Sequence, residues 1–390
     1  MVGLNLKKLR AIDGLIEQAI ESRHIPGASA LVYLNDQEQF YAEAGFADIK
    51  SGIPIRRDTV FRLFSMTKPV TGAAAMVLMQ DGELDLNDPV SKYLSGFKNQ
   101  FAASGAGRVP IKREMKIYDL LNMTSGLPYP SQDFEAGRQV AEVFDEASEG
   151  EMTTLELANR IGQCDLAFQP GERWLYGSSA DVMGAVIEAV SGQPFGRFLS
   201  ERIFAPLKML DTGFYVPQEK QARLAKTYME TGSEMEECSS SGLGISLRME
   251  RPPRFESGGA GLASTIDDYM RFARMLLNGG ELDGVRILAP KAVSYFTAGQ
   301  LNGIQTQDLE DTWVGALAGF NYANFLRISE RPERTPFIAS AGEYGWDGAM
   351  GVYFLNSPKD KLSFILMLQR NMSGTLPLTR RIRNVIFSSL

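Results

Sequence analysis

The spacing of apolar residues changes along the chain, and each change predicts a different element. The first apolar residues follow one another at intervals of three and four, which predicts an amphipathic helix. Residues 27–48 instead alternate apolar and polar side chains on either side of Asn35 and Asp36, as expected of a β-hairpin with a tight turn. Helical spacing then returns, with Pro and Gly between its segments, from residue 71 to about residue 206.

The second half of the chain returns to strand patterns. Residues 231–261 are rich in Ser, Gly and Pro and predict a long loop that includes one hairpin at most. Residues 264–280 predict a helix with a Ser or Thr as its N-cap. Strand patterns follow in 351–358 and 361–371, and a final helical pattern closes the chain. Strands near both ends enclose helices in the middle, so we expect one sheet assembled from both ends of the chain.

Composition and charge narrow the class of protein. The chain has 390 residues, of which 44% are hydrophobic and 22% are charged, enough for a substantial core in roughly two domains. A formal charge of -7 offers no attraction to nucleic acid. No apolar stretch approaches the roughly 20 residues that cross a bilayer, and no signal peptide is visible, so we expect a cytoplasmic protein without membrane partners. The two cysteines, Cys164 and Cys238, are expected to be buried free thiols.

The chain holds a single histidine, His24, and this excludes several enzyme classes. A Ser-His-Asp enzyme of the α/β-hydrolase kind needs a histidine after its nucleophile and a G-x-S-x-G motif, and the sequence has neither. Zinc-ligand patterns such as H-E-x-x-H and glycine-rich phosphate-binding motifs are also missing. The sequence therefore predicts neither a metal nor a cofactor, and acid-base chemistry has to proceed without histidine. His24 is interpreted as structural.

Ser65 and Lys68 stand three residues apart at the start of an apolar helical segment. Such residues share one face of a helix, and a buried lysine whose pKa falls towards neutrality can remove the proton of a serine. The N-terminus of the helix adds free backbone N–H groups for an oxyanion. The motif is weak by itself, because Ser95 and Lys98 repeat it in a polar loop. Taken alone, the first pair fits a catalytic site and a polar turn equally well.

Two further motifs follow in the order that serine chemistry needs. Tyr176 precedes Ser178 at the start of a predicted helix, and a tyrosine hydroxyl can hydrogen-bond a lysine base and carry a proton to a leaving group. Trp346, Asp347 and Gly348 lead into a predicted strand, whose glycine-rich edge lets a substrate approach a backbone N–H. In a purely structural interpretation, the tyrosine is a core aromatic and the tryptophan packs beside a glycine turn.

With these three motifs in order, the sequence resembles the serine β-lactamase and penicillin-recognising family, in the branch of class C β-lactamases, D,D-carboxypeptidases and family VIII carboxylesterases. The resemblance runs from about residue 25 to residue 371. It implies an α/β (α+β) fold with two domains. Residues 1–72 and 207–390 would form an antiparallel sheet flanked by helices, and residues 73–206 a mostly helical domain. The active site would lie in the groove between them.

The resemblance also implies a role for each matching residue. Ser65 would be the nucleophile that forms an acyl-enzyme, with Lys68 and Tyr176 as the pair that handles its proton. The backbone N–H groups of Ser65 and Ala349 would form the oxyanion hole. Which member of the lysine-tyrosine pair is the general base stays open, because the two can titrate as a unit. Tyr129 is interpreted as part of the cleft wall.

The third motif departs from that of β-lactamases and D,D-peptidases, in which a Lys-Thr-Gly sequence attracts the substrate carboxylate. Here Trp346 and Asp347 replace it, and a carboxylate left unpaired in a desolvated cleft is costly, so an anionic substrate is disfavoured. Ser178 stands where β-lactamases carry Asn; together with Gly348 and Tyr129 it completes the substrate-binding residues. Both departures are similar to the esterase branch. We therefore predict a carboxylesterase acting on short-chain, largely uncharged esters.

Two alternatives remain open. The same residues would serve a β-lactamase or a D,D-peptidase or amidase, so the predicted partner is a small-molecule ester or a β-lactam. A binding protein that keeps the fold without catalysis is the other alternative. Efficient hydrolysis of nitrocefin with negligible ester turnover would favour the first, and the absence of a covalent adduct with a fluorophosphonate would favour the second.

Overall fold

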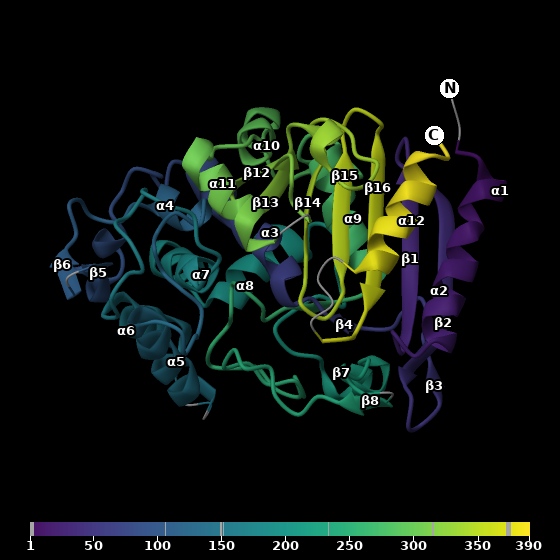
Figure 1. Cartoon of the computed structure of the whole chain (residues 1–390), viewed down its shortest axis with the longest axis horizontal. Coiled ribbons are helices and arrows are strands. Elements are labelled where there is room, and N and C mark those ends of the chain that lie inside the picture. Colours follow the sequence, from purple (N-terminus) through teal and green to yellow (C-terminus); the bar gives the residue numbers. More distant parts are fainter. Residues whose placement is uncertain are drawn as a thin grey trace.

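The computed structural model describes residues 4–105, 107–148, 150, 152–232, 234–313, 316–371 and 376–390. At its centre lies an eight-stranded antiparallel sheet with the strand order β12-β13-β14-β15-β16-β1-β2-β3 (Figure 1). The strands are β1 (Gly27–Leu34), β2 (Gln37–Asp48), β3 (Ile53–Pro54), β12 (Phe320–Ala323), β13 (Leu326–Ser329), β14 (Tyr344–Asp347), β15 (Tyr353–Ser357) and β16 (Leu362–Leu368). The first and last thirds of the chain meet where β1 pairs with β16, which confirms the predicted assembly from both ends.

The turn between β1 and β2 follows directly from its sequence. Asn35 has φ 51° and Asp36 has φ 64°, so both central residues are left-handed, as a two-residue turn matched to the twist of the strands requires. Asn and Asp tolerate this conformation better than other non-glycine residues. The predicted hairpin and its turn are confirmed.

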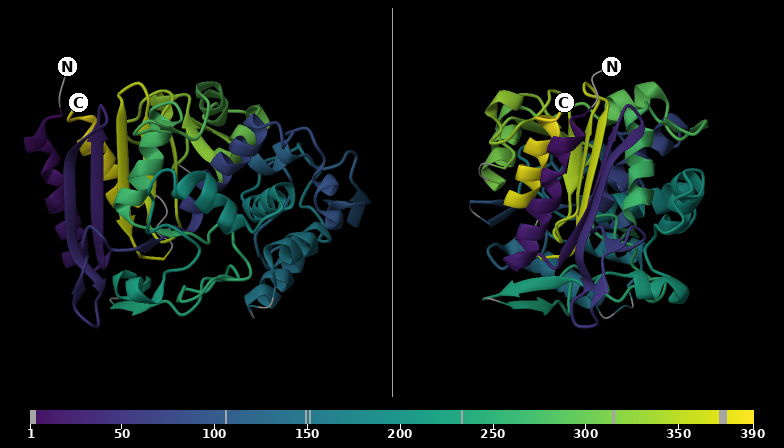
Figure 2. Two further views of the ribbon diagram at one scale, coloured as in Figure 1. Left: turned by 180° about the vertical axis from the view of Figure 1, so that it is seen from behind. Right: turned by 90° about the vertical axis from the view of Figure 1, so that its right-hand side faces the viewer.

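Helices cover both faces of the sheet. On one face lie α2 (Ala11–Glu21) and α12 (Pro377–Phe387), and on the other lies α9 (Ile266–Leu277), as the edge-on view in Figure 2 shows. The side chains of β16 alternate between these faces, with Phe364 and Leu366 in the core under α12 and Ile365 and Met367 in the larger core under α9. A sheet covered on both sides explains why β16 is buried along its whole length and is apolar at every position except Ser363.

The helices from the middle of the chain lie beside the sheet (Figure 1). They are α4 (Ile117–Leu121), α5 (Glu135–Ser148), α6 (Thr154–Gly162), α7 (Ser179–Ser191) and α8 (Phe195–Leu199), with the hairpin of β5 (Phe101–Ser104) and β6 (Gly107–Pro110) at their outer side. The helix α3 (Thr67–Gln80) lies between these helices and the sheet and contacts both α7 and β14. Because the predicted boundary after residue 72 falls inside α3, one buried helix joins the two predicted domains. The domain limits themselves stay a prediction.

The other helices and strands complete the fold. They are α1 (Leu6–Leu9), α10 (Pro290–Phe296), α11 (Gly303–Thr312), β4 (Phe61–Arg62), β7 (Tyr228–Thr231), β8 (Glu234–Glu237), β9 (Ala263–Ser264), β10 (Glu281–Leu282) and β11 (Val285–Arg286). Between β8 and β9 the described chain forms neither helix nor strand, so the predicted long loop with one hairpin is confirmed. Thr265 caps α9 as expected, and Cys164 and Cys238 are buried free thiols. Across the described residues, every helix is too short or too polar to cross a membrane.

Candidate active site

Ser65 lies at the junction of the sheet side and the helical side. The short strand β4 leads into a single turn of 3-10 helix, η1 (Phe64–Met66), which continues directly into α3. Phe64 has φ 44°, a conformation that costs free energy for a bulky side chain and persists only where packing enforces it. Phe64 is buried against Ala260 and Met350. The strained residue turns the chain so that Ser65, which is partly exposed, precedes the first turn of α3.

Lys68 is fully buried in that first turn, and its amine meets three oxygen atoms. Its Nζ lies 3.1 Å from Ser65 Oγ, 2.8 Å from Tyr129 OH and 2.9 Å from the carbonyl oxygen of Gly259. Burial lowers the pKa of Lys68 to about 7, against the opposing effect of Asp181. A neutral amine has two N–H groups, which can donate to the tyrosine oxygen and to the carbonyl oxygen. Its lone pair then remains to accept the serine proton.

The second S-x-x-K pair has none of these features. Lys98 is exposed, and its backbone is extended rather than helical. Ser95 lies in a separate 3-10 turn, where its hydroxyl contacts Asn159. The two copies of the motif therefore differ in the burial of their lysines, a difference that their identical spacing does not reveal.

Tyr176 approaches Ser65 from the other side. Its hydroxyl hydrogen-bonds with Ser65 and accepts a hydrogen bond from Trp346 Nε1 at 3.1 Å. Burial raises the pKa of Tyr176, and these two hydrogen bonds only partly oppose the rise. Lys68 Nζ lies 4.6 Å from the centre of the tyrosine ring, and no hydrogen bond joins the two side chains among the described residues. Ser65 is thus the link between them.

Aromatic side chains hold Tyr176 in place. The chain has three tryptophans, and all of them surround this ring. The ring centres of Trp174, Trp313 and Trp346 lie 6.3, 5.0 and 5.6 Å from that of Tyr176. Tyr129 adds an edge contact at 5.6 Å. Packing on all these sides fixes the direction in which the tyrosine hydroxyl points.

The segment after β14 brings a second backbone N–H towards the nucleophile. A Cβ atom at Gly348 would lie 2.3 Å from the carbonyl oxygen of Leu63, so glycine is required for β14 to approach the chain just ahead of Ser65. The next residue is Ala349. Within the described residues, the N–H groups of Ser65 and Ala349 donate to no protein acceptor. They are therefore available to a substrate oxygen.

Asp347 and Ser178, two further predicted substrate-binding residues, also have protein partners. Asp347 forms an ion pair with the buried Arg327, which also donates to the carbonyl of Phe354 at 3.1 Å. Its charge is therefore balanced, which differs from the expectation that an acid here repels anions. Ser178 is buried at the start of α7, and its hydroxyl donates to the carbonyl of Pro128 at 3.0 Å.

Asp181 is a buried acid that the sequence motifs do not point to. It lies on α7, and its carboxylate accepts hydrogen bonds from the Ser257 hydroxyl and, at 3.0 Å, from the N–H of Gly259. Gly259 is thus held by Asp181 on one side and by Lys68 on the other. Burial raises the pKa of Asp181, while the charge of Lys68 and the two hydrogen bonds lower it. The sequence offered one signal for Asp181, namely a single acidic residue near the start of an apolar helix, five residues after Tyr176.

Comparisons with known proteins show the family of the chain. The Beta-lactamase family model matches residues 12–385. Protein Rv1367c of Mycobacterium tuberculosis is 32% identical over 364 residues, which cover 91% of this chain and 88% of that protein. Esterase EstB of Burkholderia gladioli is 28% identical over 399 residues, covering 97% and 94%. The solved structure of EstCE1, a hydrolase with promiscuous acyltransferase activity, superimposes with a TM-score of 0.84 at 24% identity and covers 98% of this chain and 99% of its own. The chain therefore belongs to the beta-lactamase family of serine hydrolases.

Proposed function

We propose that this protein is a carboxylesterase that cleaves short-chain esters through an acyl-enzyme on Ser65. The observation that carries the proposal is the contact between Ser65 Oγ and Lys68 Nζ, 3.1 Å apart, with the lysine fully buried. A lysine with a pKa of about 7 is half neutral at pH 7, so it can act as a general base without histidine.

Acylation follows from the contacts of these groups. Lys68 takes the proton of the Ser65 hydroxyl while Oγ attacks the ester carbonyl carbon. The N–H groups of Ser65 and Ala349 would hold the oxygen on which negative charge develops. The bond from carbon to the alcohol oxygen then breaks. Tyr176, whose pKa is raised by burial, is protonated at neutral pH and supplies a proton to the leaving alkoxide.

Deacylation reuses the same groups with water as the nucleophile. Water attacks the acyl carbon and gives a proton to the Tyr176 oxygen that acylation left deprotonated. The bond to Ser65 Oγ breaks while Lys68 returns its proton to Oγ, so the carboxylic acid leaves and all three side chains are restored. Asp181 would act here as a positioning residue, because its hydrogen bond fixes the Gly259 carbonyl that accepts from Lys68. Its negative charge also favours the lysinium that forms during each proton transfer.

The third motif supports an ester over a β-lactam or a peptide terminus. Trp346 occupies the position of the lysine that attracts a substrate carboxylate in the related enzymes, and its indole N–H is already engaged with Tyr176. Arg327, the cation beside this motif, is buried and paired with Asp347. Neither side chain offers a free positive charge to a substrate carboxylate at β14. The esterase among the relatives supports the same choice.

The test compares esters and a β-lactam on matched variants. Wild type should hydrolyse p-nitrophenyl butyrate far better than nitrocefin, and Ser65→Ala should lower kcat by at least about 10³-fold, because removing a nucleophile leaves only the residual effects of binding. Ser95→Ala, in the second copy of the motif, is the matched control and should behave as wild type. A fluorophosphonate should add one mass adduct at Ser65. Ester turnover that survives in Ser65→Ala would refute the proposal, and nitrocefin as the preferred substrate would replace the ester with a β-lactam.

A further inference from the structure

Two buried polar groups beside Tyr176 have no protein partner. The side chain of Tyr322, on β12, is fully buried, and its hydroxyl forms no hydrogen bond with any described residue. The indole N–H of Trp174 is also buried and has no acceptor in the described part of the chain. A buried polar group without a partner lowers stability, so such groups are rare in folded proteins and need a physical explanation.

Both groups adjoin the ring that carries the candidate proton donor. The ring centre of Tyr322 lies 5.5 Å from that of Trp174 and 5.1 Å from that of Trp346. The ring centres of the same two tryptophans lie 6.3 and 5.6 Å from that of Tyr176. Tyr322 and Tyr176 therefore share both neighbours, and the unpaired hydroxyl belongs to the surroundings of the proton donor.

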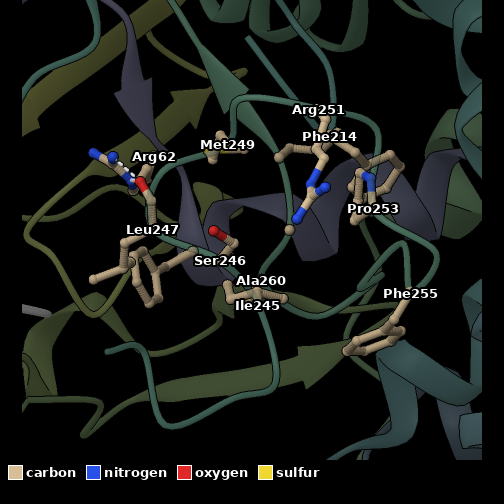
Figure 3. A pocket seen from close by; sticks show the side chains of 13 residues that line it. Arg62, Phe214, Ile245, Ser246, Leu247, Met249, Arg251, Pro253, Phe255 and Ala260 are labelled. Carbon is tan, nitrogen blue, oxygen red and sulfur yellow. Dashed lines mark hydrogen bonds between the residues drawn. The ribbon is translucent and has the colours of Figure 1, made fainter. Parts of the chain in front are cut away.

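The pocket beside the loop between β8 and β9 supplies no acceptor for these groups. Figure 3 shows its lining side chains, and neither Tyr322 nor Trp174 is among them. The surroundings of Tyr176 thus contain three buried donors, namely the hydroxyl of Tyr322 and the N–H groups of Trp174 and Trp346. Within the described residues, only the N–H of Trp346 is engaged, and it donates to the Tyr176 hydroxyl.

An excess of donors suits the charge that Tyr176 acquires in the proposed reaction. When the bond from the acyl carbon to the alcohol oxygen breaks, the alcohol oxygen takes the proton of Tyr176. The electron pair of that O–H bond stays on the tyrosine oxygen, which becomes a tyrosinate. Burial raises the pKa of Tyr176, so the tyrosinate is costly to form. Hydrogen-bond donors held in place where a charge develops lower that cost, as they do in an oxyanion hole.

A charge on Tyr176 also acts on Tyr322. Burial raises the pKa of Tyr322, and the negative charge of an ionised Tyr176 raises it further. Tyr322 therefore keeps its proton when Tyr176 loses its own. A protonated hydroxyl near a tyrosinate can donate to it, which gives the unpaired group a partner at the step where charge appears.

Resting on the proposed function, in which Tyr176 protonates the leaving alcohol, we propose that Tyr322 is a positioning residue whose hydroxyl donates a hydrogen bond to the Tyr176 tyrosinate. Tyr322 touches no substrate and transfers no proton. It assists the departure of alcohols that need a proton in order to leave. In deacylation, water returns the proton to Tyr176 and the charge disappears.

The experiment varies the alcohol while the acyl group stays the same, so deacylation is common to both substrates. For p-nitrophenyl butyrate and ethyl butyrate, kcat/KM is measured in wild type and Tyr322→Phe. The p-nitrophenolate ion leaves without a proton, whereas ethoxide needs one. Tyr322→Phe should therefore lower kcat/KM for ethyl butyrate about tenfold, the effect of one hydrogen bond to a charged oxygen, and change that for p-nitrophenyl butyrate less than about twofold.

Tyr344→Phe is the matched control. It removes another buried tyrosine hydroxyl from the same sheet, one that accepts a hydrogen bond from Asn356 at 3.1 Å. Its ratio of the two kcat/KM values should equal that of wild type. Thermal unfolding adds a second measurement, because Tyr322→Phe removes a hydroxyl without a partner and should leave Tm unchanged or raise it, whereas Tyr344→Phe should lower Tm. A lower Tm in Tyr322→Phe would show that its hydroxyl has a structural partner and would count against the inference.

A ratio that is the same in Tyr322→Phe and wild type overturns the inference, as does an equal loss for both esters. In both cases turnover of p-nitrophenyl butyrate leaves the proposed function standing. If neither ester is turned over, kcat/KM is replaced by the rates at which the diphenyl and bis-p-nitrophenyl esters of one alkylphosphonate label Ser65, because labelling needs no deacylation. A loss confined to the diphenyl ester in Tyr322→Phe supports the inference, and an equal change for both refutes it. Without any labelling of Ser65 in wild type, the proposed function fails and the inference fails with it.

Discussion

The protonation of Lys68 sets a measurable limit on activity at low pH. Only the neutral amine can accept the serine proton. With a pKa of about 7, the neutral fraction is about 0.9 at pH 8, about 0.5 at pH 7 and about 0.09 at pH 6. We therefore predict that kcat/KM for p-nitrophenyl butyrate falls about tenfold between pH 8 and pH 6, with a limiting slope of one. For a lysine with the ordinary pKa near 10.4, the whole range from pH 6 to pH 8 would instead lie below the pKa, and kcat/KM would fall with a slope of one throughout it.

Asp181→Asn separates the charge of this buried acid from its hydrogen bonds. The amide oxygen can still accept from Gly259 and Ser257, but the negative charge that raises the pKa of Lys68 is removed. The pKa of Lys68 should therefore decrease, and the acid limb should move to lower pH. The loss of kcat/KM between pH 8 and pH 6 should then be smaller than in wild type, even where the maximal rate is reduced because the lysinium is less stabilised.

The assay is a pH-rate profile from pH 5 to pH 9 at constant ionic strength. The fraction of protein that forms a fluorophosphonate adduct at Ser65 gives the concentration of intact active sites. Glu188→Gln is the matched control, since Glu188 is a half-buried acid on the same helix α7 whose backbone partner is Phe195. Its profile should overlay that of wild type. A wild-type rate that does not change between pH 6 and pH 8, or an Asp181→Asn limb that stays in place or moves to higher pH, would refute the reasoning.

Three further variants test the surroundings of the site. Trp346→Phe removes the hydrogen bond to the Tyr176 hydroxyl and should lower kcat about three- to tenfold with little change in KM; an unchanged kcat would count against Tyr176 as proton donor. Arg327→Met removes a buried arginine from its ion pair with the partly buried Asp347 and should lower the free energy of unfolding by about 3 kcal/mol, measured by urea titration, whereas a stable variant would show that the pair is dispensable. Gly348→Ala places a methyl group 2.3 Å from a carbonyl oxygen and should lower kcat by about 10²-fold; wild-type kinetics would contradict the close approach of β14.

Much of the fold could be predicted because the deciding interactions are local. The turn at Asn35 and Asp36 depends on two residues that tolerate left-handed backbone, and the cap of α9 depends on a Thr side chain and the N–H three residues later. The helix that begins at residue 67 follows from its apolar spacing. By contrast, the domain boundary predicted after residue 72 falls inside that helix. The helix packs against both the sheet and the helices beside it, so its sequence pattern does not change where one domain ends and the next begins.

The site could be predicted only where a motif spans a few residues. Ser65 and Lys68 are one helical turn apart, so their contact follows from spacing. The contact of Tyr129 with Lys68 joins residues 61 positions apart and arises from tertiary packing. The pairing of Asp347 with Arg327 crosses between neighbouring strands, and it removes the repulsion of anions that the motif alone suggested for Asp347. Asp181 had no motif to mark it, since only burial distinguishes it from a surface acid.

The three tryptophans provide an intrinsic fluorescence probe of the candidate site. Because all three of them surround one tyrosine, the tryptophan emission of the whole chain originates close to the candidate site, and Trp346 on β14 is its only source within the central sheet. Emission should therefore change when an acyl group is attached to Ser65, without any added dye. For the same reason, an unfolding curve followed by tryptophan fluorescence reports the loss of the site, and the strands of the sheet away from β14 have to be followed by a different signal.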